Sequence, residues 1–182
     1  SKFWSNQPVP NIPDTRESVT KTSSAFQMVS MLEGAVERGT GRRIKAIGKP
    51  LAGKTGTTNQ AFDTWFIGFS PDLAVGVFVG FDTPRSLGKK EQGASVAAPI
   101  FQEFMTHSLD GKPAIPFRIP PDIRLVRVNG VTGQPASSGD RNIILEAFKP
   151  GTIPTGRQQV ISGISSFDPV GPASSSGTGS LY

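Results

Sequence analysis

The chain has 182 residues, carries a formal net charge of +5 and contains no cysteine. The lack of cysteine excludes disulfide bonds, thiolate nucleophiles and zinc fingers. Apolar residues make up 36% and charged residues 18% of the sequence, and 21 glycines with 16 prolines predict many turns. The basic balance is compatible with an anionic partner, and no apolar run is long enough to cross a bilayer.

The first regular element is expected after a connecting segment, residues 1–20, that is punctuated by proline and asparagine. SSAFQMVSMLEGAVERG predicts a helix, with Ser24 as N-cap of a capping box to Gln27 and Gly39 at its C-terminal stop. Its apolar residues recur at helical spacing and are expected to face inward: Ala25, Met28, Val29, Leu32, Ala35 and Val36.

The central part of the chain predicts a hairpin and a second helix. DTWFIGFSPDLAVGVFVGFD reads as two strands joined at Ser70-Pro71-Asp72, because β-branched and aromatic runs flank a turn. The second strand, residues 73–81, is apolar on both faces and is therefore expected to be central in its sheet. SVAAPIFQEFMTHSL predicts a helix capped by Ser95, whose inward side chains are Ile100, Phe101, Phe104, Met105 and Leu109.

From residue 112 the composition changes. KPAIPFRIPPDI is a proline-rich linker that cannot be helical. IRLVRVNGVTGQP predicts a strand, a tight turn at Asn129-Gly130 and a second strand, and IILEAFKPGTIPT is a further short apolar segment. Residues 162–182 are of low complexity and predict disorder. The sequence thus predicts an α+β fold over 1–111, a linker with a small β extension over 112–161, and a tail over 162–182.

The segment GKPLAGKTGTT satisfies two motifs that exclude one another. Gly48, Gly53, Lys54 and Thr55 match the phosphate-binding loop, which requires a strand before it and a helix directly after it. RRIKAI is a poor buried strand, Pro50 removes a backbone donor, and the residues after Lys54 are poor helix formers. Features that keep the nucleotide-binding alternative open are Asp82 and the helical spacing of Phe62, Trp65, Phe66 and Phe69.

The second motif is K-T-G on a strand. Alternation places Lys54, Gly56 and Thr58 on one side and Thr55 and Thr57 on the other. A lysine there lowers the cost of nearby negative charge, threonine hydroxyls can hold a carboxylate, and an outward Thr57 N–H can serve as an oxyanion donor. An ordinary threonine-rich strand with an exposed lysine is the alternative.

The order and spacing of several blocks resemble a known family. MVSMLEGAVERGTGRR, LAGKTGTTN, DTWFIGFSPDLAVGVFVGFD and GASVAAPIFQEFM resemble the C-terminal half of the transpeptidase domain of class A penicillin-binding proteins, which are bifunctional peptidoglycan synthases. The resemblance covers residues 22–109, and IRLVRVNGVTGQPAS and EAFKPGTIPT resemble the extension that follows this domain. It implies an antiparallel sheet flanked by helices, as in serine β-lactamases.

The resemblance also implies an activity. It is the D,D-transpeptidase reaction of cell-wall synthesis, by a serine acyl-enzyme, on stem peptides ending in D-Ala-D-Ala, with β-lactams as inhibitors. No metal or organic cofactor is implied, nucleic acid is not an expected partner, and the family places the work on the periplasmic face of the plasma membrane, anchored by an upstream helix. Lys54 would be catalytic, and the substrate-binding residues would be Thr55, Gly56, Thr57 and Thr58.

Two motifs of the family have no convincing counterpart. One S-x-x-K string, Ser18 to Lys21, lies 36 residues before Lys54 in a loop-like stretch, whereas the family's nucleophile lies most of a domain upstream. No S-x-N string occurs. We therefore interpret Ser18 as coincidental and expect the nucleophile on the remainder of the parent polypeptide. A non-catalytic scaffold with the same fold is a further alternative.

The remaining polar residues predict structural roles. His107 lies near a helix end, Asn59 and Asp63 shape a turn, and Trp65 packs on a strand. The basic residues before the K-T-G motif predict a solvated face: Arg38, Arg42, Arg43, Lys45 and Lys49.

Overall fold

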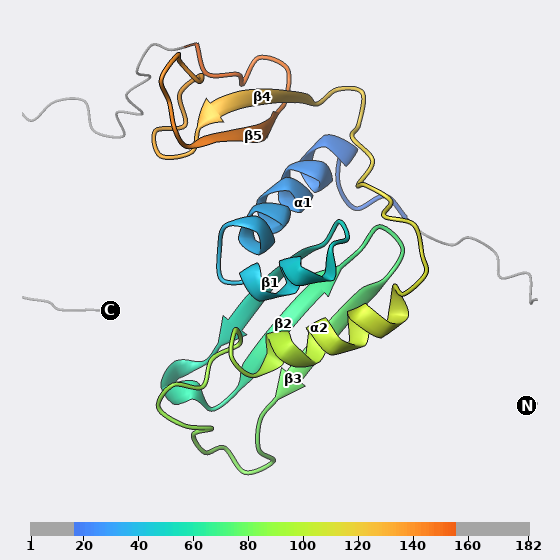
Figure 1. Ribbon diagram of the computed structural model, residues 1–182, viewed down its shortest axis with the longest axis vertical. Helices are drawn as coiled ribbons and strands as arrows, with labels where there is room; N and C mark the ends of the chain where they lie inside the picture. Colours follow the sequence, from blue (N-terminus) through green and yellow to red (C-terminus); the bar gives the residue numbers. More distant parts are fainter. Residues whose placement is uncertain (1–16, 156–182) are drawn as a thin grey trace, which may run out of the picture.

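The computed structural model describes residues 17–155, so the expectations for residues 1–16 and for the tail lie outside the described part. Within residues 17–155, nine elements follow one another (Figure 1). The helical ones are α1 (Thr22–Glu37), η1 (Arg42–Ile47), η2 (Asn59–Ala61) and α2 (Ala97–Ser108). The strands are β1 (Ala52–Thr57), β2 (Thr64–Phe69), β3 (Ala74–Val79), β4 (Arg124–Asn129) and β5 (Ile143–Phe148).

The strands form two antiparallel sheets, which confirms the α+β class. One sheet has the order β1-β2-β3 and the other pairs β4 with β5. The hairpin between β2 and β3 turns where the sequence predicts it, because the Ser70 N–H donates to Leu73 O at 2.9 Å and its hydroxyl accepts from the Leu73 N–H at 3.2 Å. Among residues 17–155, no helix is long and apolar enough to cross a membrane.

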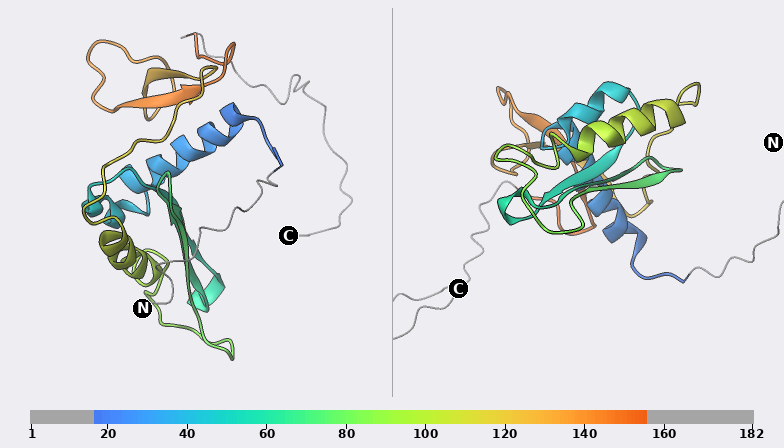
Figure 2. Two further views of the ribbon diagram at one scale, coloured as in Figure 1. Left: turned by 90° about the vertical axis from the view of Figure 1, so that its right-hand side faces the viewer. Right: turned by 90° about the horizontal axis from the view of Figure 1, so that it is seen from below.

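The main core lies between α2 and one face of the three-stranded sheet. Figure 2 shows this sheet nearly edge-on, with α2 and η1 against the same face. The rings of Phe66 and Phe101 are 4.7 Å apart, and both side chains are fully buried. Ile44 of η1 and Met105 of α2 join the same cluster. The opposite face of the sheet exposes Trp65, Ile67 and Phe78.

A second, smaller core joins α1 to the β4–β5 sheet. It consists of Phe26, Ile123 and Ala147, with Phe117 of the proline-rich linker packed against them. The linker forms no helix, as predicted, and the ring of Phe117 also meets that of Phe69 edge-on at 5.6 Å. The extension is therefore held by aromatic contacts on both α1 and the main sheet.

The predicted capping box of the first helix is wrong. The helix begins at Thr22 with Lys21 as N-cap, and no side chain caps it. Ser24 and Gln27 bind the extension instead, because Gln27 Nε2 donates to Ala147 O at 2.9 Å and Lys149 Nζ donates to the Ser24 hydroxyl at 2.8 Å. The Ser24 hydroxyl and the Gln27 amide, which would have capped the helix, are therefore bonded to distant residues of the extension. The helix does end near Gly39, at Glu37.

The inward faces of both helices differ in part from the prediction. On α1, Phe26 and Val36 are buried, whereas Met28 is 54% exposed. On α2, the buried apolar residues are Ala97, Ala98, Phe101 and Met105, followed by Leu109 just beyond the helix, whereas Ile100 and Phe104 are about half exposed. The predicted cap Ser95 lies outside the helix and bonds the turn before it, accepting from the Gln92 N–H at 2.9 Å.

Two strand predictions are also corrected. Within residues 17–155, β3 is an edge strand and β2 is central, so apolarity on both faces of β3 did not identify its place in the sheet. The turn after β4 spans residues 129–134, closed by the Asn129 N–H to Gln134 O bond at 2.9 Å, and is not a tight turn at Asn129-Gly130. The partner of β4 is β5, and the predicted second strand is reduced to a single bridge between Val128 and Pro135.

Candidate functional site

The K-T-G motif lies on β1, in an extended strand. Lys54 pairs with Ile67 and Gly56 with Trp65 in the antiparallel register. The element that follows is η2, a single 3₁₀ turn of three residues, and no α-helix begins at Lys54. The phosphate-loop interpretation is therefore wrong, because its anion site is the N-terminus of a helix. The helical spacing of aromatic residues after Phe62 was also misleading, because that segment is β2.

Two residues of β1 direct their backbone N–H and C=O groups away from β2. The Thr58 N–H donates to Asp63 O at 3.0 Å, so it points toward the neighbouring strand. Successive N–H groups of a strand point in opposite directions in its plane. The N–H and C=O of Thr57 and of Thr55 consequently point away from β2. In the described part of the chain β1 pairs with β2 only, so these groups lie on its outer edge.

The Lys54 ammonium lies at this outer edge. Its Nζ donates to Thr55 O at 3.0 Å and lies 3.4 Å from the Thr55 hydroxyl. The Thr55 hydroxyl in turn is 2.8 Å from that of Thr40, which follows α1. Lys54 is exposed and Thr55 is half-buried. A cation and two hydroxyls are therefore grouped beside outward-facing backbone, where an anionic oxygen would find several donors.

A glycine from a distant loop contacts the end of the K-T-G strand. The Gly93 N–H donates to the Thr57 hydroxyl at 3.0 Å. A Cβ on Gly93 would lie 2.5 Å from Trp65 O and 2.6 Å from Gly56 O, so only glycine fits against this backbone. Because the Thr57 oxygen accepts from Gly93, its own proton remains available for another acceptor. Sequence reasoning missed this contact, and no spacing rule links residues 36 positions apart.

The turn after β1 is held in an unusual conformation. The Thr58 hydroxyl accepts from the Asp63 N–H at 2.8 Å and closes the turn, as expected for a structural role of this segment. Gln60 and Ala61 have φ of 61° and 53°, a left-handed conformation that costs roughly 1–3 kcal/mol for a residue other than glycine. The Ser86 hydroxyl donates to Gln60 O at 2.7 Å, and the Leu87 N–H donates to Ala61 O at 2.9 Å. The loop after β3 thus stabilises the strained turn.

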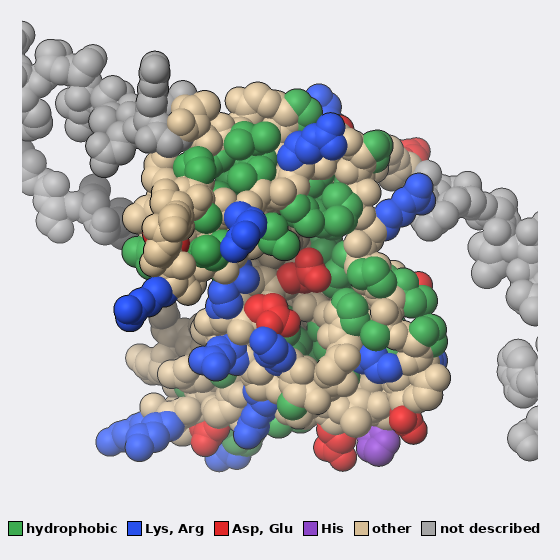
Figure 3. All heavy atoms as spheres, turned by 45° about the horizontal axis from the view of Figure 1, so that its top comes forward, with side chains coloured by type: hydrophobic (Ala, Val, Ile, Leu, Met, Phe, Trp, Pro, Cys, Tyr) green, Lys and Arg blue, Asp and Glu red, His purple; other side chains and the backbone are tan. Residues whose placement is uncertain are grey.

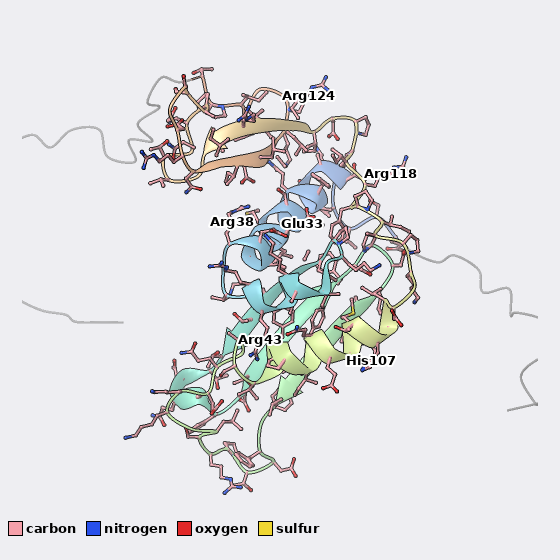
Figure 4. The ribbon with its side chains drawn as sticks, in the orientation of Figure 1. Glu33, Arg38, Arg43, His107, Arg118 and Arg124 are labelled. Carbon is pink, nitrogen blue, oxygen red and sulfur yellow. The ribbon has the colours of Figure 1, made fainter. Side chains whose placement is uncertain are left out.

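Other residues singled out from the sequence have structural roles. Trp65 packs on Phe78 with ring centroids 4.6 Å apart, as predicted. His107 is exposed in the last turn of α2, where Figure 4 shows it at the outer surface. Ser18 lies in irregular chain before α1, and its hydroxyl donates to Thr20 O at 3.3 Å.

The basic cluster is a surface feature, as predicted. Lys45 forms an ion pair with Glu37, and Lys49 donates to the carbonyl of Lys112. In residues 17–155 no three histidine, aspartate or glutamate side chains gather where they could hold a metal ion.

A hollow separates α1 from β5 on another face of the molecule. Figure 3 shows acidic side chains at the centre of this face with basic ones around them, and Figure 4 places Glu33 on α1. Glu33, Glu37, Arg38 and Lys45 contribute to the lining of the hollow. Burial, followed by repulsion from the Glu37 carboxylate, raises the pKa of Glu33 above its ordinary value.

In the loop between β4 and β5, hydrogen bonds lower the pKa of Asp140. They come first from the Ser137 N–H at 2.8 Å and then from the Asn129 side chain at 3.0 Å. The same Asn129 side chain accepts from the Val131 N–H at 2.9 Å, so one aspartate and one asparagine together shape this loop.

Comparison with known proteins identifies relatives of this chain. The family model "Penicillin binding protein transpeptidase domain" matches residues 10–106. Penicillin-binding protein 1A of Rickettsia prowazekii is 46% identical over 135 residues, which are 74% of this chain and 17% of that protein. Penicillin-binding protein 1A of Pseudomonas aeruginosa is 42% identical over 138 residues, 75% of this chain and 17% of that protein.

A solved structure supports the same relationship. The crystal structure of penicillin-binding protein 1A from Haemophilus influenzae matches with a TM-score of 0.63 and 35% identity, covering 72% of this chain and 21% of that one. The chain therefore spans about a fifth or less of the length of the relatives that it matches.

Proposed function

We propose, from the premise that this chain belongs to the penicillin-binding protein transpeptidase family, that it forms the K-T-G wall of the active site of a peptidoglycan D,D-transpeptidase. The observation that carries the proposal is the outer edge of β1, where the Lys54 ammonium lies beside Thr55 O and the Thr57 N–H points away from β2. The Lys54 ammonium and the Thr57 N–H are hydrogen-bond donors that can stabilise negative charge on an acyl group held along the strand.

The proposed reaction has two steps. A serine on a part of the protein outside this chain attacks the carbonyl of the penultimate residue of a stem peptide that ends in D-Ala-D-Ala. The peptide bond breaks, and D-alanine leaves with the proton from the serine. An amine of a neighbouring peptidoglycan strand then attacks the ester carbon, the new amide forms, and the serine regains a proton. Covalent catalysis replaces one difficult step by two easier ones.

Each residue of the K-T-G segment has a proposed role in this scheme. Lys54 supports proton transfer and lowers the cost of the anionic intermediate. The Thr57 N–H is one oxyanion donor, and the hydroxyls of Thr55 and Thr57 hold the terminal carboxylate of the donor peptide. Gly56 lets another backbone approach closely, and Thr58 shapes the end of the groove because its hydroxyl is bonded to the Asp63 N–H.

The wider setting follows from the same family. β-Lactams would acylate the same serine, and the reaction needs neither a metal nor an organic cofactor. We place the protein on the periplasmic side of the plasma membrane. Residues 1–111 would belong to the transpeptidase domain, residues 112–161 to a small extension, and residues 162–182 to a tail.

Covalent labelling by a fluorescent penicillin tests the proposal in the full-length protein that carries this chain. Lys54→Ala should slow acylation by about 100-fold or more, because general acid–base groups contribute 10²–10⁴-fold. Circular dichroism should show an unchanged fold, since Lys54 is exposed. The matched control is Ser18→Ala, which removes the serine of the coincidental S-x-x-K string and should label normally.

Three outcomes contradict parts of the proposal. Normal labelling of the Lys54 variant would exclude the catalytic role of that lysine. Loss of labelling in the Ser18 variant would identify Ser18 as the nucleophile. No adduct on the unsubstituted protein would favour a non-catalytic scaffold that has kept the fold.

A further inference from the structure

The hollow between α1 and β5, of about 560 Å³, takes no part in the reaction proposed above. Figure 1 shows that β5 is the strand of the small sheet that lies nearer α1. Residues of α1 and of the first half of β5 line much of the hollow: Ser30, Glu33, Glu37, Ile143, Ile144 and Leu145. It therefore has one wall of polar helix surface and one wall of apolar strand.

A hydrogen bond of β4 shows which backbone groups of β5 point toward this hollow. The Ala136 N–H donates to Arg127 O at 2.9 Å, so Arg127 directs its backbone groups away from β5. Arg127 is opposite Leu145 in the register. Opposite residues of an antiparallel pair exchange both bonds or neither, and the two kinds of pair alternate. The N–H and C=O of Leu145, and likewise those of Ile143 and Ala147, therefore point away from β4.

One of these outward groups has a partner of the kind that a further strand would supply. Gln27 Nε2 donates to Ala147 O at 2.9 Å, so a side-chain amide of α1 occupies the place of a strand N–H. Within residues 17–155, the backbone groups of Ile143 and Leu145 that point outward have no such partner. They form a short open edge of the small sheet, and an open edge can pair with a further strand.

The helix wall of the hollow contains an uncompensated anion. Within residues 17–155, the Glu33 carboxylate forms no ion pair, whereas that of Glu37 pairs with Lys45. The Arg38 guanidinium lies against Gly34 and does not pair with Glu33. Burial, followed by repulsion from Glu37, raises the pKa of Glu33, as expected for a carboxylate without a cation beside it. A basic side chain from a partner would supply the missing charge.

The strand wall of the hollow offers an apolar surface. Successive side chains of a strand alternate between its two faces, so Leu145 shares the face of Ala147. Ala147 is buried against Phe26 of α1, whereas Leu145 is 57% exposed. The side chain of lysine or arginine has an apolar stem and a charged end. Its stem would cover Leu145 while its charged end reached Glu33.

We propose that the outer edge of β5 binds an extended segment of another polypeptide as an added strand, with a lysine or arginine side chain beside Glu33. Main-chain hydrogen bonds to Ile143 and Leu145 supply affinity, and the basic side chain supplies specificity, as in other cases of strand addition. The proposal does not rest on the transpeptidase reaction, and its test uses no penicillin.

NMR titration of the ¹⁵N-labelled 182-residue chain with acetyl-Thr-Val-Lys-Val-Thr-amide tests the proposal. This peptide has blocked ends, strand-forming residues and one positive charge. We expect saturable shifts at the amides of residues 143–147 and of residues 30–37. The same peptide with methyl groups on its three central amide nitrogens has lost donors on both strand edges and should not bind.

Amide hydrogen exchange gives a control within the strand. The N–H groups of Ile143 and Leu145 point away from β4, whereas that of Ile144 points toward its partner Val128. We expect the peptide to slow exchange at Ile143 and Leu145 and to leave exchange at Ile144 unchanged. Equal slowing at all three positions would indicate a general stabilisation of the chain and would overturn the added strand.

The role of the charge is tested by replacing each partner in turn. A peptide with glutamine in place of lysine should bind about fivefold more weakly, near the upper end for a partly exposed ion pair. Glu33→Gln, at a half-buried position, should bind both peptides equally. Glu103→Gln on α2 is the matched control, because Glu103 does not line the hollow, and it should keep the preference for lysine. The same preference in the Glu33 variant would overturn the role assigned to this carboxylate.

Two other occupants of the edge would give different results. Contacts between residues 156–182 and Ile143 in the absence of peptide would show that the chain's own tail covers the edge. Shifts of Ile143 and Leu145 that depend on the concentration of the chain alone would identify a second copy. Either result would overturn the proposal, and so would equal binding of the methylated peptide.

Discussion

Gly93 shows how one residue without a side chain can shape a site. Its backbone lies against Gly56, and its N–H occupies one lone pair of the Thr57 hydroxyl. The direction of the Thr57 proton therefore depends on a loop that precedes α2 and not on the K-T-G strand alone. A close approach of two glycines is a common way to bring two backbones together.

Gly93→Ala should destabilise the chain by about 1–3 kcal/mol, as overpacking typically does. The added Cβ would lie 2.5 Å from Trp65 O, a distance that the rigid backbone of β2 cannot relieve. Urea unfolding measures the change. Gly76→Ala is the control, because its Cβ would have a nearest neighbour at 3.9 Å, and it should be nearly neutral. Equal stability of the two variants would contradict the packing argument.

At the scale of elements, α2 is a half-buried helix whose buried face is set by the sheet. Phe101 is fully buried against Phe66, whereas Phe104 is 49% exposed only three residues later. Both phenylalanines fit an apolar helical stripe in the sequence. The sheet covers one of them because the helix axis crosses above β2 and β3, where it packs on the central strand.

Phe101→Ala should cost about 3–5 kcal/mol of the free energy of unfolding, because it leaves a cavity against Phe66. Phe104→Ala, on the same helix and with the same change of side chain, should cost less than about 1 kcal/mol. Thermal and urea denaturation of both variants measure the difference. A similar loss for the two would mean that the exposed phenylalanine is covered in solution.

At the scale of the whole molecule, α1 belongs to two cores. Its Val36 packs in the main cluster, and its Phe26 packs in the cluster of the extension. Figure 2 shows α1 between the small β4–β5 sheet and the rest of the described chain. Between these two contacts the helix borders the hollow that contains Glu33 and Glu37. The half-buried carboxylate of Glu33 therefore lies where the small sheet meets the body of the chain.

The raised pKa of Glu33 has a defined effect on stability. The folded chain holds the Glu33 proton more tightly than the unfolded chain, so this group's stabilising contribution is present below the ordinary pKa of 4.5 and is lost as the pH rises through the folded value. Glu33→Gln should raise the free energy of unfolding at pH 7, by less than about 1 kcal/mol because solvent screens a half-exposed group.

The gain from Glu33→Gln should shrink as the pH falls below 4.5, where the wild-type carboxyl is protonated in both states. Urea unfolding between pH 3 and pH 8 measures it. Glu103→Gln, at an exposed position of α2, is the matched control for the change of side chain. A Glu33 variant that is less stable than wild type at pH 7 would contradict the assigned cause of the pKa shift.

Short stretches of sequence determine several of the strands, turns and irregular segments of this chain. Pro50 and the threonines after Lys54 argued against a helix there, and β1 is a strand. Ser70 placed the β2–β3 turn because a serine hydroxyl can bond the backbone two and three residues ahead. The prolines of the linker excluded a helix. These predictions hold because each depends on dihedral angles and hydrogen bonds within a few residues.

Packing between distant segments decided the rest. Ser24 and Gln27 suited a local cap, but residues about 120 positions away offered them partners. The partner of β4, the edge position of β3 and the contact of Gly93 with Thr57 likewise depend on which segments meet in space. Such contacts form because they bury apolar surface and because the two segments fit each other in shape. The spacing of neighbouring residues in the sequence does not reveal this free energy.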